Sequence, residues 1–269
     1  MTLELSPTRD ANRSRAPKYA IRFPEQREHC SQSEECCEVY IDGRWRRYRL
    51  HDYDAIYKVP GLYEQIFAGR LQCSSPQRVV RVFSDVLRDW PTTNGDLRVL
   101  DLGAGNGMVG EELRTLGIRS LVGVDILPEA EEAAERDRPG LYDDYLAADL
   151  CDLQDEDASR ILAFTPNCLV TVAALGFGDI PPKAFITAYN LITTPGWVVF
   201  NIKETFLTGI DDSGFSRLVR KMADEEYMQI QAYRRYNHRL SISGKRLHYV
   251  AIVARKLRPL PETFSGAVQ

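Results

Sequence analysis

Five short apolar runs alternate with helix-like patterns between residues 98 and 222, and this alternation restricts the chain to few folds. The runs are residues 98–102, 120–126, 145–148, 169–174 and 197–203. Apolar stripes with helical spacing lie between them; Val109, Leu113 and Leu116 form the first. Strands that alternate with helices form a parallel sheet with helices on both faces. We therefore expect a doubly wound α/β core.

The end of the chain breaks this alternation. Residues 228–240 and 247–254 have the composition of two long strands, and only the turn at Ser243-Gly244 separates them. No helix fits into so short a connection, so these two strands must pair antiparallel. The expected sheet is therefore seven-stranded and mostly parallel, with a C-terminal antiparallel hairpin.

The segments outside this core differ from one another in composition. Residues 1–37 are rich in Arg, Glu, Ser and Pro with few periodic apolar positions, which predicts a flexible N-terminal arm. The pattern of residues 38–95 predicts an N-terminal helical cap or lid, which begins with a hairpin that turns at Asp42-Gly43. The core is expected over residues 96–257, and residues 258–269 form a C-terminal tail.

Composition excludes several classes of protein. No apolar run approaches the roughly 18 residues that a membrane span requires, and the N-terminus carries no apolar secretory signal. A net charge of −4 and a pI near 5.7 argue against a broad nucleic-acid interface, which usually needs a basic face. Six cysteines at irregular spacing predict reduced thiols and a cytoplasmic protein. We expect a monomer or a homodimer.

The turn after the first strand is rich in glycine and fits two patterns. Residues 105–110 satisfy the dinucleotide fingerprint GxGxxG, whereas residues 101–107 fit DxGxGxG equally well. Asp125 follows about twenty residues later, at the end of the second strand, where a carboxylate can hold a ribose. Both patterns therefore predict a bound nucleotide, and they differ in which one.

Three features favour the second pattern. Gly105 comes two residues too late to close the strand, and a fingerprint that starts at Gly103 would place Met108 at its third glycine. Asp101 lies at the end of the strand, where a carboxylate would face a cation rather than a pyrophosphate. The closing antiparallel hairpin is also foreign to the usual dinucleotide fold.

At this point the chain resembles the class I S-adenosylmethionine-dependent methyltransferases. The resemblance rests on DLGAGNG, the acid in VGVDI, Asp149-Leu150 in AADL and the final hairpin, and covers about residues 98–256. It implies a Rossmann-like fold, S-adenosylmethionine as cofactor and methyl transfer as the reaction. An NAD(P)-dependent oxidoreductase is the alternative, as is a non-catalytic cofactor-binding module that uses the cap for a protein partner.

The resemblance also implies a role for each matching residue. Asp101 would sense the ammonium of the cofactor, Asp125 would accept hydrogen bonds from both ribose hydroxyls, and Ile126 would pack on the adenine. Asp149, beside Leu150, would accept from the adenine amino group. The turn of Gly103, Ala104, Gly105 and Gly107 would lie against the methionine part, and an apolar turn at Ala173 would cover the sulfonium.

The segment after the fourth strand bears on the acceptor of the methyl group. Residues 171–181 lack the Asn/Asp-Pro-Pro-aromatic motif of enzymes that methylate nucleobase or glutamine amino groups. The chain also lacks the paired-glutamate loop of protein arginine methyltransferases. This segment resembles the small-molecule branch of the family, so we expect a small-molecule substrate.

Candidate catalytic residues come from the crevice end of the fifth strand and from the cap. Glu204 is the first candidate for a general base, although a salt bridge between Lys203 and Glu204 is an equal alternative. His51 is the second, because the ordinary histidine pKa near 6.5 suits proton abstraction, and Tyr57 would orient the acceptor. The candidate substrate-binding residues are Tyr53, Tyr63, Phe177, Lys203 and Arg235.

Two further expectations concern chemistry that the sequence does not support. His29-Cys30 and Cys36-Cys37 match no tetrahedral zinc spacing, so no metal site is predicted. No serine or cysteine lies in a recognisable nucleophile elbow or beside a paired base. We therefore expect direct in-line transfer without a covalent enzyme intermediate.

Overall fold

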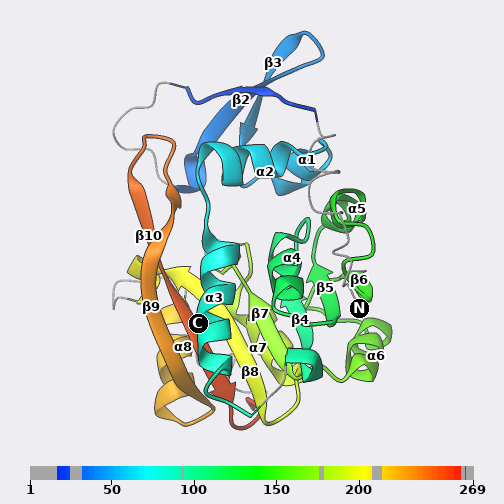
Figure 1. Cartoon of the computed structure of the whole chain (residues 1–269), viewed down its shortest axis with the longest axis vertical. Helices are drawn as coiled ribbons and strands as arrows, with labels where there is room; N and C mark the ends of the chain where they lie inside the picture. The colour runs from blue at the N-terminus through cyan, green and yellow to red at the C-terminus, as the bar shows by residue number, and fades with distance from the viewer. Residues whose placement is uncertain are drawn as a thin grey trace, which may run out of the picture.

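A twisted seven-stranded sheet occupies the centre of the computed structural model, which describes residues 17–24, 32–91, 94–175, 179–207, 214–261 and 264 (Figure 1). Its strand order is β6-β5-β4-β7-β8-β10-β9. The parallel strands are β4 (Arg98–Leu102), β5 (Ser120–Asp125), β6 (Asp144–Ala147), β7 (Cys168–Thr171) and β8 (Gly196–Lys203). The doubly wound sheet expected from the alternating pattern is thus confirmed.

The C-terminal hairpin is also confirmed. Strands β9 (Met228–Leu240) and β10 (Arg246–Lys256) pair antiparallel, and β10 pairs antiparallel with β8. Gly244 has φ +82° in the connecting turn, a conformation that glycine adopts without strain. The hairpin extends past the edge of the parallel strands toward the N-terminal segment (Figure 1).

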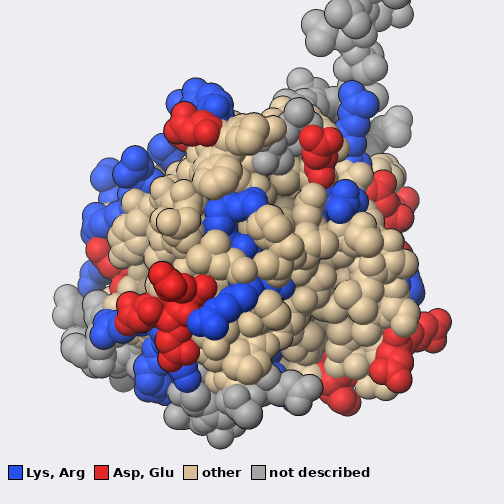
Figure 2. Space-filling view, turned by 90° about the horizontal axis from the view of Figure 1, so that it is seen from below, with Lys and Arg blue, Asp and Glu red and all other residues tan. Residues whose placement is uncertain are grey.

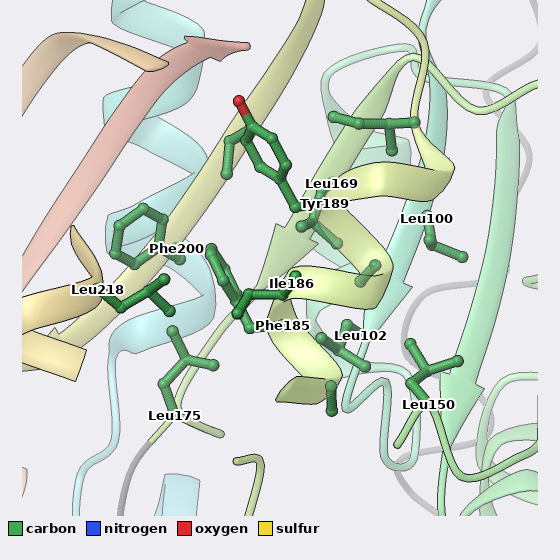
Figure 3. Packing of buried hydrophobic residues seen from close by; sticks show 14 of the residues in the cluster. Leu100, Leu102, Leu150, Leu169, Leu175, Phe185, Ile186, Tyr189, Phe200 and Leu218 are labelled. Atoms are coloured by element: carbon green, nitrogen blue, oxygen red, sulfur yellow. The ribbon is translucent and has the colours of Figure 1, made fainter. Parts of the chain in front are cut away.

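Helices cover both faces of the sheet because each carries one apolar stripe. Helices α3 (Ser75–Leu87) and α4 (Met108–Thr115) pack on one face. The other face carries α6 (Asp155–Phe164), α7 (Pro182–Leu191) and α8 (Phe215–Asp224). Figure 3 shows α7 inserting Phe185 and Ile186 among sheet residues such as Leu100 and Phe200, and the rings of Phe185 and Phe200 lie 5.5 Å apart. Helix α5 (Pro128–Asp137) follows β5 and contacts the N-terminal segment.

The N-terminal segment forms a cap over the carboxyl ends of the parallel strands (Figure 1). Its three-stranded antiparallel sheet has the order β1-β2-β3, and Asp42 and Gly43 both have positive φ in the predicted hairpin turn. Short helical segments follow this sheet. The cap elements are β1 (Ala20–Arg22), η1 (Gln32–Glu34), β2 (Cys36–Ile41), β3 (Arg44–Arg49), α1 (Tyr53–Tyr57), α2 (Leu62–Glu64) and η2 (Gln65–Arg70).

Two expectations about this segment are corrected. Strand β1 extends the predicted hairpin into a three-stranded sheet, and α3, expected within the cap, packs on the central sheet instead. The expected arm boundary at residue 37 falls inside the cap, because β1 pairs with β2 and Cys37 is fully buried. The three residues of β1 give too short a pattern for periodicity to reveal. His29 and Cys30 lie outside the described residues.

A buried ion pair joins the cap to the hairpin. The guanidinium of Arg239 on β9 lies 2.7 Å from the Glu35 carboxylate, and both side chains are under 5% exposed. Glu35 also accepts a hydrogen bond from the Ile242 backbone N–H, and Leu240 N–H donates to the Leu71 carbonyl. A buried charge needs a partner fixed in place. These contacts therefore hold the cap in one position above the sheet.

The distribution of surface charge and the character of the helices are those of an ordinary globular chain. Acidic and basic side chains lie side by side on the end of the molecule opposite the cap (Figure 2). Within the described ranges no helix has both the length and the apolar character to cross a bilayer, and no three His, Cys, Asp or Glu side chains gather as metal ligands. Two short helical turns complete the core, η3 (Asn94–Asp96) and η4 (Glu204–Leu207).

Candidate active site

The glycine-rich turn after β4 adopts a conformation that only glycine tolerates well. Gly103, Gly105 and Gly107 have φ values of +69°, +54° and +87°. Space is equally restricted, since a Cβ on Gly103 would lie 2.9 Å from the Ala174 Cβ. A Cβ on Gly105 would lie 2.4 Å from the Tyr57 hydroxyl oxygen. Tyr57 of the cap therefore lies directly against the turn.

Asp125 ends β5 with its carboxylate fixed by backbone hydrogen bonds. Its Oδ2 accepts from the Gly105 N–H at 3.0 Å and its Oδ1 from the Leu127 N–H at 3.1 Å. Burial raises the pKa of Asp125, and these backbone N–H groups oppose that rise. Ile126 beside it is 58% exposed, an unusual degree for an isoleucine at a cavity wall. Asp125 and Ile126 thus place an oriented carboxylate and an apolar side chain next to each other.

Asp101 is a fully buried acid with one unused oxygen. Its Oδ2 accepts from the Tyr142 hydroxyl at 2.8 Å, whereas its Oδ1 is buried without a hydrogen-bond partner among the described residues. Burial raises the pKa of Asp101 to about 7. An orphaned carboxylate oxygen behind the glycine turn fits a cationic ligand group.

This shifted pKa makes ligand binding depend on pH. From about pH 4 to pH 7 the folded state holds a proton on Asp101 that the unfolded chain has released, so the stability contributed by this group falls as pH rises. A bound ammonium favours the ionised form. The affinity for S-adenosylhomocysteine should therefore rise about tenfold from pH 6 to pH 8.

Calorimetry in buffers of different ionisation enthalpy measures the accompanying proton release directly. Asp101→Asn should bind more weakly at pH 8 and should lose the proton release near neutral pH. Proton release that is the same in this variant and the wild type would place the titrating group elsewhere.

A cavity of about 280 Å³ opens between the cap and the carboxyl ends of the strands. Five of the residues that line it come from the cap, namely His51, Tyr53, Asp54, Tyr57 and Tyr63. The core contributes Leu102, Gly103, Asp125, Ile126, Leu127, Ala148, Asp149, Leu150, Val172, Ala173, Ala174, Asp179, Ile180, Pro181 and Ala184. Four aspartates line the cavity, Asp54 from the cap and Asp125, Asp149 and Asp179 from the core, and they give it a potential that favours cationic ligands.

The tyrosines of the cap form one aromatic cluster with Phe67. The Tyr57 and Tyr63 rings lie 5.0 Å apart, and the Tyr63 and Phe67 rings 4.6 Å apart. Burial raises the pKa of Tyr53, Tyr57 and Tyr63, so their hydroxyls stay protonated and can donate hydrogen bonds at neutral pH. The cluster supplies a rigid apolar wall with polar tips.

His51 and Asp179 pair with each other in the wall of the cavity. The His51 Nδ1 lies 3.2 Å from each Asp179 carboxylate oxygen, and the two side chains are 14% and 24% exposed. A carboxylate on Nδ1 fixes the orientation of the imidazole ring. Sequence reasoning missed Asp179, which follows the apolar turn after β7 and lies 128 residues from its partner.

Ala173 lines the cavity in a strained backbone conformation. Its φ is +60°, and its N–H donates to the Asn201 Oδ1 at 2.6 Å. The Asn201 amide donates in turn to the Tyr236 hydroxyl at 2.5 Å and to the Ser75 hydroxyl at 3.3 Å. A positive φ on a residue with a side chain persists only when its surroundings hold it. Asn201 is the residue that holds it here.

Asn201→Ala should lower the free energy of unfolding by about 1–3 kcal/mol, because it leaves a buried N–H and a buried hydroxyl with fewer partners. Urea denaturation measures this change. Asn237→Ala, an exposed asparagine on β9, is the matched control and should change stability by less than about 0.5 kcal/mol. Equal stability of the two variants would contradict the role given to Asn201.

The structure gathers most, but not all, of the predicted site residues. His51, Tyr53, Tyr57, Tyr63, Gly103, Asp125, Ile126, Asp149, Leu150 and Ala173 line the one cavity. Asp101 of β4 and Ala104, Gly105 and Gly107 of the glycine turn are not among the described residues that line the cavity. Asp101 could therefore reach a bound ammonium through the turn or through water. Phe177 lies outside the described residues.

The expected placement of Glu204 is wrong. Its carboxylate pairs with the Arg235 guanidinium at 2.7 Å, and the two side chains are 41% and 53% exposed. The chain leaves β8 into η4 at Glu204, which turns the residue toward β9 instead of the cavity. Lys203 places its ammonium 5.6 Å from the Phe206 ring. Among the described residues, the cavity lining includes none of Lys203, Glu204 and Arg235.

This architecture defines a class. A sheet ordered β6-β5-β4-β7-β8-β10-β9, with a glycine turn after β4 and an acid at the end of β5, is the fold of class I S-adenosylmethionine-dependent methyltransferases. Residues 75–248 match a family model described as a methyltransferase domain, and the chain belongs to this family. Its cofactor is S-adenosylmethionine. No curated protein matches the chain.

Solved structures share the architecture at low identity. A Thermoplasma acidophilum protein is 16% identical over 66% of this chain and 84% of its own, with a TM-score of 0.47. A putative RNA methyltransferase from Pyrococcus horikoshii is 13% identical over 68% and 84%, with a TM-score of 0.48. Magnesium protoporphyrin IX methyltransferase from Synechocystis, solved with bound S-adenosylhomocysteine, is 15% identical over 67% and 82%, with a TM-score of 0.45.

Proposed function

We propose that the protein transfers the methyl group of S-adenosylmethionine to a small-molecule acceptor by direct displacement. The observation that carries this proposal is the position of His51 and Asp179. His51 of the cap and Asp179 of the core pair in the wall of the same cavity that the glycine turn and Asp125 border. A cavity of about 280 Å³ closed by tyrosines is near the size of small-ligand sites. Residues from about 17 to 74 are the lid in this proposal, and residues 75–257 are the core.

The cavity has the groups that the cofactor needs. Asp125 would accept from the ribose hydroxyls, Ile126 would cover one face of the adenine, and Asp149 would accept from the adenine amino group. The orphaned Asp101 oxygen and the bare glycine turn suit the methionine end. When bound, the cofactor supplies a methyl group on a positively charged sulfur.

His51 is the proposed general base, and Asp179 is the residue that positions it. The imidazole Nε2 would take the proton of the acceptor as the new bond forms, and Asp179 would stabilise the resulting imidazolium. Cys73, which lines a small cavity together with this pair, has its pKa raised by burial and stays a thiol. A buried thiol is a poor nucleophile, which supports direct transfer without a covalent enzyme intermediate.

Incubation with methyl-labelled S-adenosylmethionine tests the proposed acceptor class. The purified protein is mixed separately with metabolite, RNA and protein fractions of a cell extract, and the label is followed by mass spectrometry. Label in the metabolite fraction, lost in His51→Ala, supports the proposal. Label confined to RNA or protein would contradict a small-molecule acceptor, and binding without any transfer would favour a non-catalytic module.

A further inference from the structure

We propose that a second, smaller cavity behind His51 holds the reacting group of the acceptor, and that this group is a compact uncharged hydrogen-bond donor, a hydroxyl or an amine. This inference rests on the proposed function, because it names the class of substrate for the same site. The smaller cavity, called here the inner cavity, shares His51, Tyr53, Tyr63, Ala173 and Asp179 with the larger one.

Size limits what the inner cavity can accept. Its volume is about 30 Å³, roughly room for one or two water-sized groups. Leu50, Phe67 and Leu175 close its apolar sides, and Cys73 lies at its wall. A single functional group at the end of a molecule fits this space, whereas a ring or a branched group does not.

The charges around the inner cavity further limit which group it can accept. The Arg239 guanidinium at the wall is already neutralised by Glu35, with 2.7 Å between them. Burial lowers the pKa of His238 well below its ordinary value, so this ring is neutral, and burial raises the pKa of Tyr249 to about 12. Among the described residues, the walls thus offer a carboxylate no unpaired positive charge, and the nearby Asp179 would repel one. An uncharged group avoids both penalties.

The contacts of Gln32 indicate that the group bound in the inner cavity must donate a hydrogen bond. Its amide nitrogen donates to the Tyr249 hydroxyl at 3.2 Å, which fixes the side chain at the cavity wall. Its Oε1 is buried without a hydrogen-bond partner among the described residues. A buried acceptor without a donor is costly, and a ligand O–H or N–H removes that cost. A carboxylate, a thioether or an aromatic carbon has no such hydrogen to give.

The reaction then balances with groups already present. A lone pair of the acceptor oxygen or nitrogen forms the new bond to the methyl carbon, and the bond from that carbon to sulfur breaks with its electron pair remaining on sulfur. The proton of the acceptor passes to the His51 Nε2. S-adenosylhomocysteine and a methyl ether or methylamine are the products, and no oxidant or metal is required.

Two variants of the inner cavity test this proposal in the full-length protein. Cys73→Leu fills the space and should lower label transfer from methyl-labelled S-adenosylmethionine to the metabolite extract by about 100-fold, because the acceptor is displaced from the methyl group. Gln32→Leu should lower it about tenfold by removing one hydrogen bond. Calorimetry should show an unchanged affinity for S-adenosylhomocysteine in both variants, which confirms that they are folded.

Matched controls separate the inner cavity from general effects of substitution. Cys151→Leu places the same side chain at a half-buried cysteine outside both cavities and should retain full transfer. Tyr249→Phe removes only the hydroxyl that accepts from Gln32. Label transfer should therefore fall less in this variant than in Gln32→Leu. Fragmentation of the labelled products should place the methyl group on oxygen or nitrogen.

The outcomes distinguish the two proposals. If the wild type binds S-adenosylhomocysteine but transfers no label, the proposed function fails and this inference fails with it. If the wild type labels metabolites and Cys73→Leu does so equally well, only the inner cavity is wrong. A labelled methyl ester of a carboxylic acid would overturn the substrate class.

Discussion

Replacing Asp125 with alanine should weaken the binding of S-adenosylhomocysteine by about a hundred- to ten-thousand-fold. The carboxylate is already oriented by the Gly105 and Leu127 N–H groups, and each of its oxygens can also accept from one ribose hydroxyl. A hydrogen bond to a charged group contributes about 1.5–3 kcal/mol, so two contribute about 3–6 kcal/mol. Tenfold in affinity per 1.4 kcal/mol gives the expected range.

Calorimetric titration measures this affinity, and two further variants sharpen the result. Asp125→Asn keeps one acceptor oxygen and should bind with intermediate affinity. Asp152→Ala, an exposed aspartate after β6, should bind as the wild type does. Wild-type affinity in Asp125→Ala would show that the ribose is not held at the end of β5.

His51→Ala should lower turnover by about a hundred- to ten-thousand-fold while leaving the affinity for S-adenosylhomocysteine nearly unchanged. This range is the usual contribution of a positioned general base. Asp179→Asn should cause a smaller loss, because the imidazole remains but its orientation and its positive charge lose their partner.

Single-turnover rates with labelled cofactor separate this effect from binding. His248→Ala, on β10 and outside both cavities, is the matched control and should keep wild-type turnover. Unchanged turnover in His51→Ala would leave the His51–Asp179 pair with a purely structural role.

The central sheet was predictable because most of its strands are long or largely buried and its helices carry regular apolar stripes. The runs at 98–102 and 228–240 match β4 and β9 to the residue. The absence of a helix between β9 and β10 already required an antiparallel pair. Local pattern and tertiary structure agree here, so sequence reasoning needed no knowledge of distant contacts.

The cap was harder to predict because distant contacts build it. Glu35 is buried only because Arg239, 204 residues later, neutralises it. Strands as short as β1 take their structure from pairing with a neighbour rather than from their own pattern. A composition rich in Arg and Glu therefore suggested an exposed arm where the chain in fact contributes to a core.

The residues at the cofactor end of the site could be predicted from the sequence, whereas those at the acceptor end could not. Gly103, Asp125 and Asp149 follow strands of one sheet, so their meeting at one edge could be deduced. Glu204 was expected at the same edge, but the η4 turn directs it toward Arg235. His51 and Asp179 meet only because the cap folds over the sheet, and no spacing in the sequence encodes that contact.

A crystal structure of the protein with S-adenosylhomocysteine tests the account most directly. We expect the ribose hydroxyls on the Asp125 carboxylate, the adenine against Ile126 and the sulfur beside Ala173, facing the His51–Asp179 pair. The inner cavity should remain open on the far side of that pair. A ligand whose sulfur faces away from His51, or one bound outside this cavity, would contradict the account.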